Sequence, residues 1–268
     1  MTATALGWYV YCITAAGEVP ALDGLAGVDR GCEVGCVTEG ELSAVVSHVR
    51  LEEFGAEALK RNLEDLAWLK QTGLAHNAVL ARALAADAVV PLRLCTIFAD
   101  EDGVRDALRH GRDSLPAALT RVRGHAEWSV KLMADPRPLE AAARERGAVP
   151  IESSSRATGH AFFARKRLER VARDHVRAEI EQAVEETHAR LQDHATAAVR
   201  LPPQDRRISG REGQMLLNGA YLVRRARAAE FAELATGLDA GHRETGLALN
   251  LSGPFAPYNF VGAESERE

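Results

Sequence analysis

A proline-rich aromatic segment near the C-terminus constrains the fold more than any other feature of this 268-residue chain. It follows an apolar run at 247–251 that predicts a terminal strand, and it reads Gly253-Pro254-Phe255-Ala256-Pro257-Tyr258-Asn259-Phe260. Two prolines so close together exclude a continuous helix or a central strand. The segment therefore predicts a stiff tail that leaves the sheet. Its three aromatic side chains need a surface to pack on, either within this protein or on a partner.

Length and composition are typical of a soluble protein with two domains. Hydrophobic residues make up 46% of the chain and charged residues 26%, with a net charge of −5, which is ordinary for globular proteins. No apolar run approaches the ~20 residues of a membrane span. The N-terminus lacks the basic segment of a signal peptide. We therefore expect a cytoplasmic protein with no membrane segment and no bias toward nucleic acid.

The first half of the chain predicts a mixed domain of strands and helices. Strands are expected at 8–13, 32–38, 41–49 and 89–94, where β-branched and aromatic residues cluster. A helix is expected at 51–84, with an irregularity at Gly73. A second helical stripe at 102–122 is expected to kink or restart at Pro116, with Ser114 available as a cap. This order indicates an α+β domain over 1–124.

The second half predicts a different arrangement of strands and helices. A strand at 125–134 is followed by a long polar connection, and then by a helix of about 35 residues from near Gly159 to about Ala195. Further strands are expected at 214–223 and 245–252, with a helix at 224–240 between them. If 197–201 or 206–209 supplies a short edge strand, the order is β-α-β-β-α-β, which is ferredoxin-like. We therefore predict a ferredoxin-like domain over 125–252 and a tail over 253–268.

A short motif at the end of one predicted strand, residues 91–98, has two interpretations. In the first, Arg93 and Thr96 contact a ligand or partner beyond the sheet edge. In the second, Arg93 pairs with a helix carboxylate such as Glu64 or Asp65, and Thr96 caps a turn. The four cysteines, at positions 12, 32, 36 and 95, are expected to be buried thiols, because their spacing lacks the second pair of a metal site.

His76 lies eight residues after Trp68 on the predicted first-domain helix. A lone histidine in such a place is usually a hydrogen-bonded structural residue, and less often a ligand or base. Phosphate-binding glycine loops, metalloprotease motifs and nucleophile elbows are all missing from the sequence. We therefore predict no catalytic residues, no metal and no cofactor.

The predicted long helix carries its charges in an unusual order. Arg170, Arg173 and Arg177 belong to a basic first half, and acidic residues fill the second half. Both halves oppose the helix macrodipole, so helix electrostatics alone do not explain the pattern. The helix is either a solvated face or a docking surface that steers a charged protein partner. Nucleic acid fits poorly, because no aromatic residues interleave the basic ones.

The chain resembles the gas vesicle accessory proteins of the F/L family. Their closing signature is Gly-Pro-Trp-Pro-Pro-Tyr-x-Phe; here Phe255 replaces the Trp and Ala256 the first proline of the pair. Their strand-end motif is Pro-Leu-Arg-Phe-Gly-Thr-x-Phe, with Leu94 and Cys95 at the Phe-Gly positions. Further matches, in the same order along about residues 8–260, are Tyr9-Val10-Tyr11-Cys12-Ile13, Trp68-Leu69 with His76, Trp128-Ser129-Val130-Lys131 and Ala220-Tyr221-Leu222-Val223.

The resemblance implies a non-enzymatic protein of gas vesicle assembly. Such a protein would bind the small hydrophobic shell protein and other accessory proteins during vesicle nucleation or growth. The residues that we expect at its binding surfaces are Arg93, Thr96, Arg170, Arg173, Arg177, Phe255, Tyr258 and Phe260. Two alternatives remain open at this stage: an α/β-barrel-type enzyme that binds haem or a small substrate through His76, and a regulatory ligand-binding module.

Overall fold

The structure is a computed structural model that describes residues 5–134, 159–203, 213–243 and 246–262. Its internal contacts divide the chain into two compact units. The first unit consists of the residues up to Glu127 together with those from Gly253 onward, and the second unit is Trp128–Ser252. The chain therefore enters the second unit after Glu127 and returns to the first at Gly253. Each unit is built on its own sheet, so the chain has the mixed α and β character that the sequence predicts.

The first sheet is centred on two long antiparallel strands, β1 (Leu6–Ala15) and β3 (Leu42–Arg50). Their register shifts between Val10 and Cys12, which marks a bulge. The strand order is β2-β3-β1-β4, and β5 also pairs with β1. Gly40 (φ 59°) forms the turn that joins β2 to β3, in the backbone region that glycine reaches without strain. The short strands are β2 (Val34–Glu39), β4 (Val90–Pro91) and β5 (Ile97–Phe98).

The helices of the first unit are more divided than the sequence predicts. Three helices replace the single helix expected at 51–84, with interruptions at Gly55 and before Leu66. The third of them runs unbroken through Gly73, where an irregularity was expected. Asp65 caps the third by accepting hydrogen bonds from the backbone N–H groups of Ala67 and Trp68. The helix expected at 102–122 does restart before Pro116. The helices are α1 (Leu51–Phe54), α2 (Ala56–Asn62), α3 (Leu66–Ala83), α4 (Glu101–His110) and α5 (Leu115–Val122).

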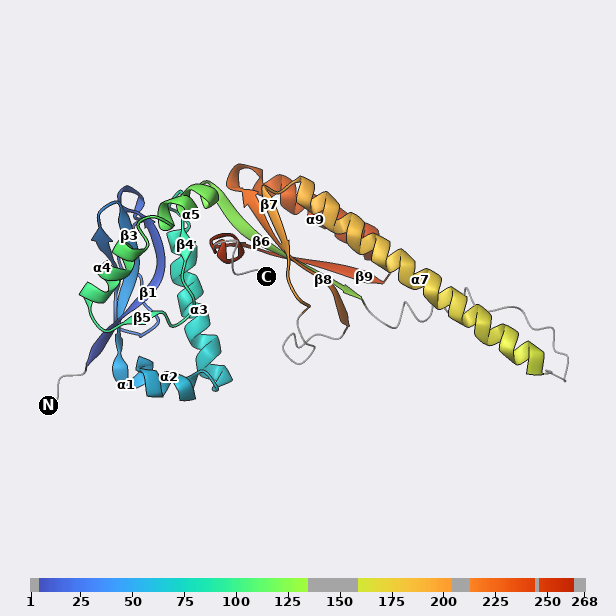
Figure 1. Cartoon of the computed structure of the whole chain (residues 1–268), viewed down its shortest axis with the longest axis horizontal. Coiled ribbons are helices and arrows are strands. Elements are labelled where there is room, and N and C mark those ends of the chain that lie inside the picture. Colours follow the sequence, from blue (N-terminus) through green and yellow to red (C-terminus); the bar gives the residue numbers. More distant parts are fainter. Residues whose placement is uncertain (1–4, 135–158, 204–212, 244–245, 263–268) are drawn as a thin grey trace. The chain divides into compact units, whose positions relative to one another are not determined.

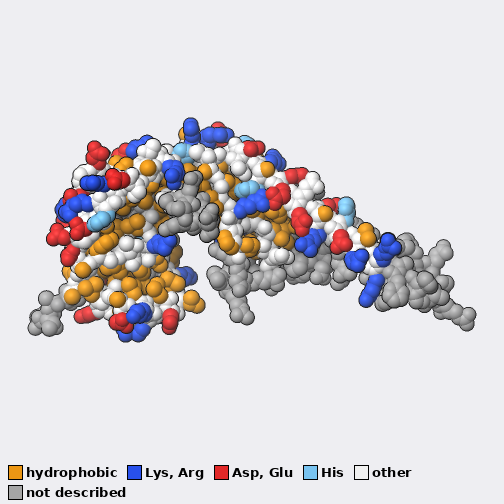
Figure 2. Space-filling model, viewed as in Figure 1, with side chains coloured by type: hydrophobic (Ala, Val, Ile, Leu, Met, Phe, Trp, Pro, Cys, Tyr) orange, Lys and Arg blue, Asp and Glu red, His pale blue; other side chains and the backbone are white. Residues whose placement is uncertain are grey.

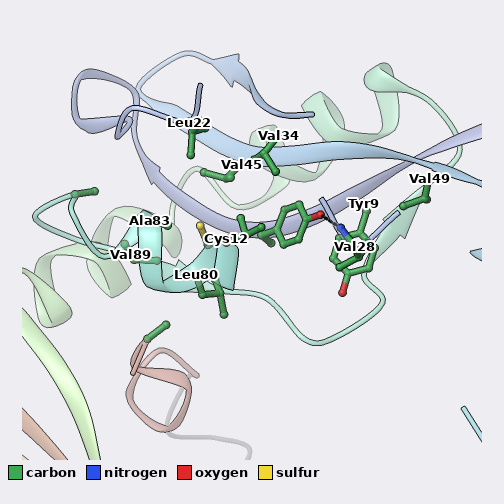
Figure 3. Packing of buried hydrophobic residues seen from close by; sticks show 14 of the residues in the cluster. Tyr9, Cys12, Leu22, Val28, Val34, Val45, Val49, Leu80, Ala83 and Val89 are labelled. Atoms are coloured by element: carbon green, nitrogen blue, oxygen red, sulfur yellow. Dashed lines mark hydrogen bonds between the residues drawn. The ribbon is translucent and has the colours of Figure 1, made fainter. Parts of the chain in front are cut away.

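The sheet of the first unit lies between α3 on one face and α4 with α5 on the other (Figure 1). Alternation along β1 sends Tyr9 and Tyr11 toward α3, where they are completely buried. Figure 3 shows this core from close by, with side chains from three strands packed against Leu80 and Ala83 of α3. The same cluster includes Ala256 of the C-terminal segment. The tail is therefore part of the core of the first unit.

The second unit alternates strands and helices in the order β6-α7-β7-β8-α9-β9. Its strand order is β7-β8-β6-β9. The edge strand is β7, at the first of the two predicted places; the other, 206–209, lies outside the described residues, as does the polar connection at 135–158. The bounds are β6 (His125–Ala134), α7 (Gly159–Asp193), β7 (Ala197–Arg200), β8 (Gln214–Arg224), α9 (Ala228–His242) and β9 (Leu247–Phe255).

Strand β9 is longer than the sequence predicts. It continues through Pro254 to Phe255, so the expected departure from the sheet at Gly253 is wrong by three residues. Strand β9 lies at an edge of its sheet, where the missing N–H of proline removes no ladder hydrogen bond. Pro254 is therefore tolerated within β9, and the strand ends only after Phe255.

Both helices of the second unit cover the same face of its sheet (Figure 1). The core between them contains Leu132 of β6, Tyr221 of β8, Phe231 of α9 and Leu191 of α7, all fully buried. Among the side chains of α7 that the structure describes, Val176 is the first that is buried, and Ala183, Val184 and Leu191 belong to this core or pack against it.

Candidate functional site

The C-terminal segment is docked on the first unit, and four of its apolar side chains lie in unlike environments. Ala256 and Phe260 are buried, each with 3% of its surface exposed. By contrast, Phe255 is 46% exposed and Tyr258 is 38% exposed. After β9 ends, a single turn of 3-10 helix at Tyr258–Phe260 directs these side chains. The segment therefore anchors itself with one set of side chains and presents another at the surface.

A directed chain of hydrogen bonds ties Tyr258 to the centre of the first unit. The hydroxyl of Tyr258 donates to the carbonyl oxygen of Leu92 (3.1 Å), so it accepts from Nε2 of His76 (2.8 Å). Nδ1 of His76 then accepts from the hydroxyl of Tyr9 (2.9 Å), whose oxygen accepts from the backbone N–H of Cys95 (2.9 Å). The carbonyl acceptor at Leu92 thus assigns His76 as the neutral tautomer that carries its proton on Nε2.

The electrostatics of His76 agree with this assignment. Its side chain is 2% exposed, and burial lowers its pKa from 6.5 to about 4. Burial also raises the pKa values of Tyr9 and Tyr258 well above their usual range. All three groups are therefore neutral near pH 7. Since both ring nitrogens of His76 are hydrogen-bonded to tyrosines, neither is free to bind a haem iron or to act as a base.

A second anchor lies one residue further along the tail. The backbone N–H and the side-chain amide of Asn259 both donate to the carboxyl group of Glu127, at 2.9 and 2.6 Å. Burial raises the pKa of Glu127, and the two bonds from Asn259 oppose that shift. Nη1 of Arg121 reaches the carbonyl oxygens of Phe260 and Gly262, each at 3.4 Å. The bonds from Asn259 therefore hold the tail at Glu127, the last residue of the first unit before the chain enters the second unit.

The strand-end motif lies directly beside the docked tail. Leu92, whose carbonyl oxygen accepts the hydrogen bond from the Tyr258 hydroxyl, immediately precedes Arg93 in the chain. Thr96 closes a turn, because its backbone N–H and its hydroxyl both donate to the carbonyl oxygen of Arg93 (3.2 and 2.8 Å). Cys95 has φ 64°, a left-handed conformation that side chains other than glycine and asparagine rarely adopt. The side chain of Arg93 is exposed, and within the described residues it forms no ion pair with Glu64 or Asp65, the predicted carboxylates, which lie just before α3.

The structure brings together some of the predicted binding residues and not others. Arg93, Thr96, Phe255, Tyr258 and Phe260 all belong to the first unit. Phe260 packs into that unit, and Thr96 serves its turn. Three residues are left with exposed surface: Arg93, Phe255 and Tyr258, which we call the tail surface.

The other predicted binding residues lie on α7 in the second unit. The side chains of Arg170 and Arg177 are exposed, and Nε of Arg177 pairs with Glu181 at 2.9 Å. Arg173 is part of the helix, but its side chain lies outside the described set. The two predicted surfaces therefore belong to different units.

Several residues that organise the site were not predicted from the sequence. Tyr9, Glu127 and Asn259 hold the tail, yet they are far apart in the chain. Glu127 does carry a signal, because a carboxylate inside an apolar strand rarely stays buried without a partner. Nothing comparable in the sequence marks Asn259.

The expected burial of all four cysteines is wrong. Cys12 is fully buried, Cys32 and Cys95 are partly buried, and Cys36 is exposed on β2. Cys36 alternates outward from an edge strand, which explains its exposure. Within the described ranges, no three His, Cys, Asp or Glu side chains are arranged to hold a metal ion. In the same part of the chain, no helix has both the length and the apolar character needed to cross a membrane.

Comparison with known proteins matches the chain over almost its whole length. The family model "Gas vesicle synthesis protein GvpL/GvpF" matches residues 7–262. Gas vesicle protein L of Streptomyces sp. (strain CB03234) is 35% identical over 258 residues, which cover 96% of this chain and 94% of that protein. Gas vesicle protein F of the same strain is 29% identical over 261 residues, which cover 94% and 98%. Both the tail and the strand-end motif lie inside the matched region.

The fold also matches a solved structure. The crystal structure of the gas vesicle protein GvpF from Anabaena sp. PCC7120 superposes with a TM-score of 0.69 and covers 97% of each chain. Sequence identity in that comparison is 18%, so the likeness establishes a shared fold and no more.

Proposed function

The chain belongs to the GvpL/GvpF family of gas vesicle synthesis proteins, and from this membership we propose that it is a non-enzymatic accessory protein of gas vesicle assembly. In this proposal it binds the small hydrophobic shell protein, together with other accessory proteins, while the vesicle nucleates or grows. It acts in the cytoplasm at the vesicle and uses neither nucleic acid, membrane nor cofactor.

The observation that carries the proposal is the tail surface. Phe255 and Tyr258 expose aromatic surface on a backbone that the bonds to His76, Leu92 and Glu127 hold in place. Aromatic side chains on a rigid support lose little conformational entropy when they bind. Arg93 adds a charge beside them. An apolar partner with an acidic or polar rim would be complementary to such a surface.

The physical requirement of the partner supports the same proposal. A shell subunit that ends in a gas-filled wall has to carry apolar surface before it is incorporated. Such surface causes aggregation unless another protein covers it reversibly. In this proposal, the small and partly exposed tail surface binds the apolar surface of the shell subunit weakly enough that the subunit can be released.

We extend the proposal to the second unit. Its element order and its strand order β7-β8-β6-β9 support a ferredoxin-like domain. We retain 1–124, 125–252 and 253–268 as the proposed domain boundaries, which limited proteolysis can test. The basic residues Arg170, Arg173 and Arg177 of α7 are proposed to steer a charged partner. Reversal of these three charges should then weaken partner capture, and salt should weaken it in the wild-type chain as well.

Mutation of the tail surface tests the proposal. Phe255→Ser should lower the amount of co-expressed shell protein that an affinity-tagged chain retains by about fivefold, as expected when roughly half a phenylalanine side chain loses its contact. Leu66→Ser is the matched control, because Leu66 is an exposed apolar residue of the same unit. Equal retention by Phe255→Ser and Leu66→Ser would contradict a role for the tail surface.

A further inference from the structure

Helix α7 carries opposite charges in its two halves. Residues 159–176 contain five Lys and Arg against two Asp and Glu, whereas residues 177–193 contain two Arg against five Asp and Glu. Figure 2 shows basic side chains gathered toward the N-terminal end of this helix and acidic ones farther along it. Each half therefore places charge where it opposes the helix macrodipole. With respect to the helix dipole, such an arrangement is unfavourable within one helix.

The described side chains in the N-terminal half of α7 are exposed to solvent. Figure 1 shows the helix continuing past the ends of the strands. Before Val176, every side chain of α7 that the structure describes is exposed, including Arg167, Arg170 and Val171. Helices in proteins gain most of their stability from packing and little from their own backbone. The exposed face that carries Arg167 and Arg170 is therefore open to contact with another surface.

We propose that α7 pairs in antiparallel orientation with α7 of a second copy of this chain. Residue 176 is the midpoint of Gly159–Asp193, so a two-fold axis near it would place the basic half of each helix against the acidic half of the other. That pairing also sets each basic half beside the negative end of the other helix dipole. The interface is then self-complementary, as two-fold symmetry requires.

The helical spacing places the charges on the correct face. Arg167 and Glu185 are 18 residues apart, which is five full turns of an α-helix. They therefore lie on one side of the helix, opposite the buried Thr187. A two-fold axis at the midpoint places Arg167 of one copy against Glu185 of the second copy, and Glu185 of the first against Arg167 of the second. Arg170 and Glu181 share that side and come to nearly the same level. These four residues define the pairing face.

Two ion pairs within the chain already engage the acidic half of this face. Glu185 accepts from Nη1 and Nη2 of Arg200 at 2.7 and 2.5 Å, and Glu181 pairs with Arg177. Both carboxylates are nevertheless largely exposed, so they retain acceptor capacity toward a second cation. Exposed ion pairs are weak individually, so several of them are needed for association. Because salt screens exposed charges, added salt should weaken the association.

Charge exchange between copies tests the pairing by analytical ultracentrifugation of the full-length chain. The basic-half variant carries Arg167→Glu with Arg170→Glu, and the acidic-half variant carries Glu181→Lys with Glu185→Lys. Each alone should lose self-association by about tenfold or more, because like charges then face each other. An equimolar mixture of the two should recover a mixed dimer. A single chain with all four substitutions should recover its own dimer.

The control has the same number of reversed charges elsewhere. Lys60→Glu with Arg112→Glu reverses two exposed cations of the first unit and should leave self-association unchanged. A wild-type chain that stays monomeric at low salt and high concentration would overturn the proposal. So would a dimer that resists the reversals, or one that neither the mixture nor the fourfold variant restores. Since the assay needs only the purified chain, its outcome is independent of whether the shell protein is captured.

Discussion

The hydroxyl group of Tyr258 offers a narrow test of how the tail is held. Phenylalanine at this position keeps the ring and its packing but removes the oxygen that accepts from Nε2 of His76 and donates to Leu92. His76 is buried, so water cannot easily replace the lost acceptor. A buried donor left without a partner costs about 1–3 kcal/mol. We expect Tyr258→Phe to lower the free energy of unfolding by about 2 kcal/mol.

The measurement is urea unfolding at pH 7.5, followed by tryptophan fluorescence. Trp68 reports on the first unit, because its ring packs on Phe54 at a centroid distance of 5.5 Å. A loss of about 2 kcal/mol corresponds to a melting temperature lower by roughly 7 °C for a unit of this size. Phe255→Leu is the matched control in the same tail. Its side chain is half exposed and it should change stability by no more than about 0.5 kcal/mol.

The two variants together decide the interpretation. If Tyr258→Phe is as stable as the wild-type chain, the chain of hydrogen bonds does not hold the tail. If Phe255→Leu is as destabilising as Tyr258→Phe, the tail is held by general packing instead. In either case the directed bonds through His76 would not be the anchor.

Four further changes follow from the structure. The pKa of His76 is about 4 in the folded chain and 6.5 in the unfolded chain. The neutral histidine therefore stabilises the fold above pH 6.5, and about 3 kcal/mol of stability is lost as the pH falls toward 4. Urea titrations across that pH range should show this loss, and His76→Gln should make the free energy of unfolding less dependent on pH. Cys95→Val should cost about 2 kcal/mol in the same assay, because a β-branched residue fits poorly at positive φ, whereas Cys95→Gly should be tolerated. Asp29→Ala should cost about 2 kcal/mol, because Asp29 is buried and its carboxyl accepts from the backbone and guanidinium of Arg50; equal unfolding midpoints would refute this. Truncation after Ser252 should lower the melting temperature of the first unit, because it removes buried side chains from that core; unchanged melting would show that the tail is not part of it.

Periodicity in the sequence predicted the second unit well. Helix α7 and strand β6 begin and end almost where the apolar pattern indicates, because both are long and regular. The region 51–84 was predicted less well, since the interruption at Gly55 depends on one residue adopting extended backbone (φ −70°, ψ 159°). The irregularity was expected at Gly73 instead, and there α3 is continuous. Local composition does not distinguish the two positions, because tertiary packing decides which glycine bends the chain.

The site was predicted only in its parts. Aromatic residues in a proline-rich tail indicate a segment that packs on something, but they do not show that Phe260 is buried while Phe255 is exposed. That difference depends on contacts between residues 182 positions apart, such as Tyr258 and His76. The neighbouring position of the strand-end motif and the tail is likewise a property of the folded chain. Motif resemblance indicated the family, whereas the geometry shows which of the motif residues are exposed.

The most direct test of the account is co-expression of the tagged chain with the small gas vesicle shell protein, followed by affinity capture at low salt. The proposed function predicts that shell protein elutes with the wild-type chain in stoichiometric amount, and that the yield falls for the Phe255→Ser variant. A wild-type chain that elutes without shell protein, both alone and when the other gas vesicle accessory proteins are co-expressed, would contradict the proposal that this protein assembles vesicles by binding the shell subunit.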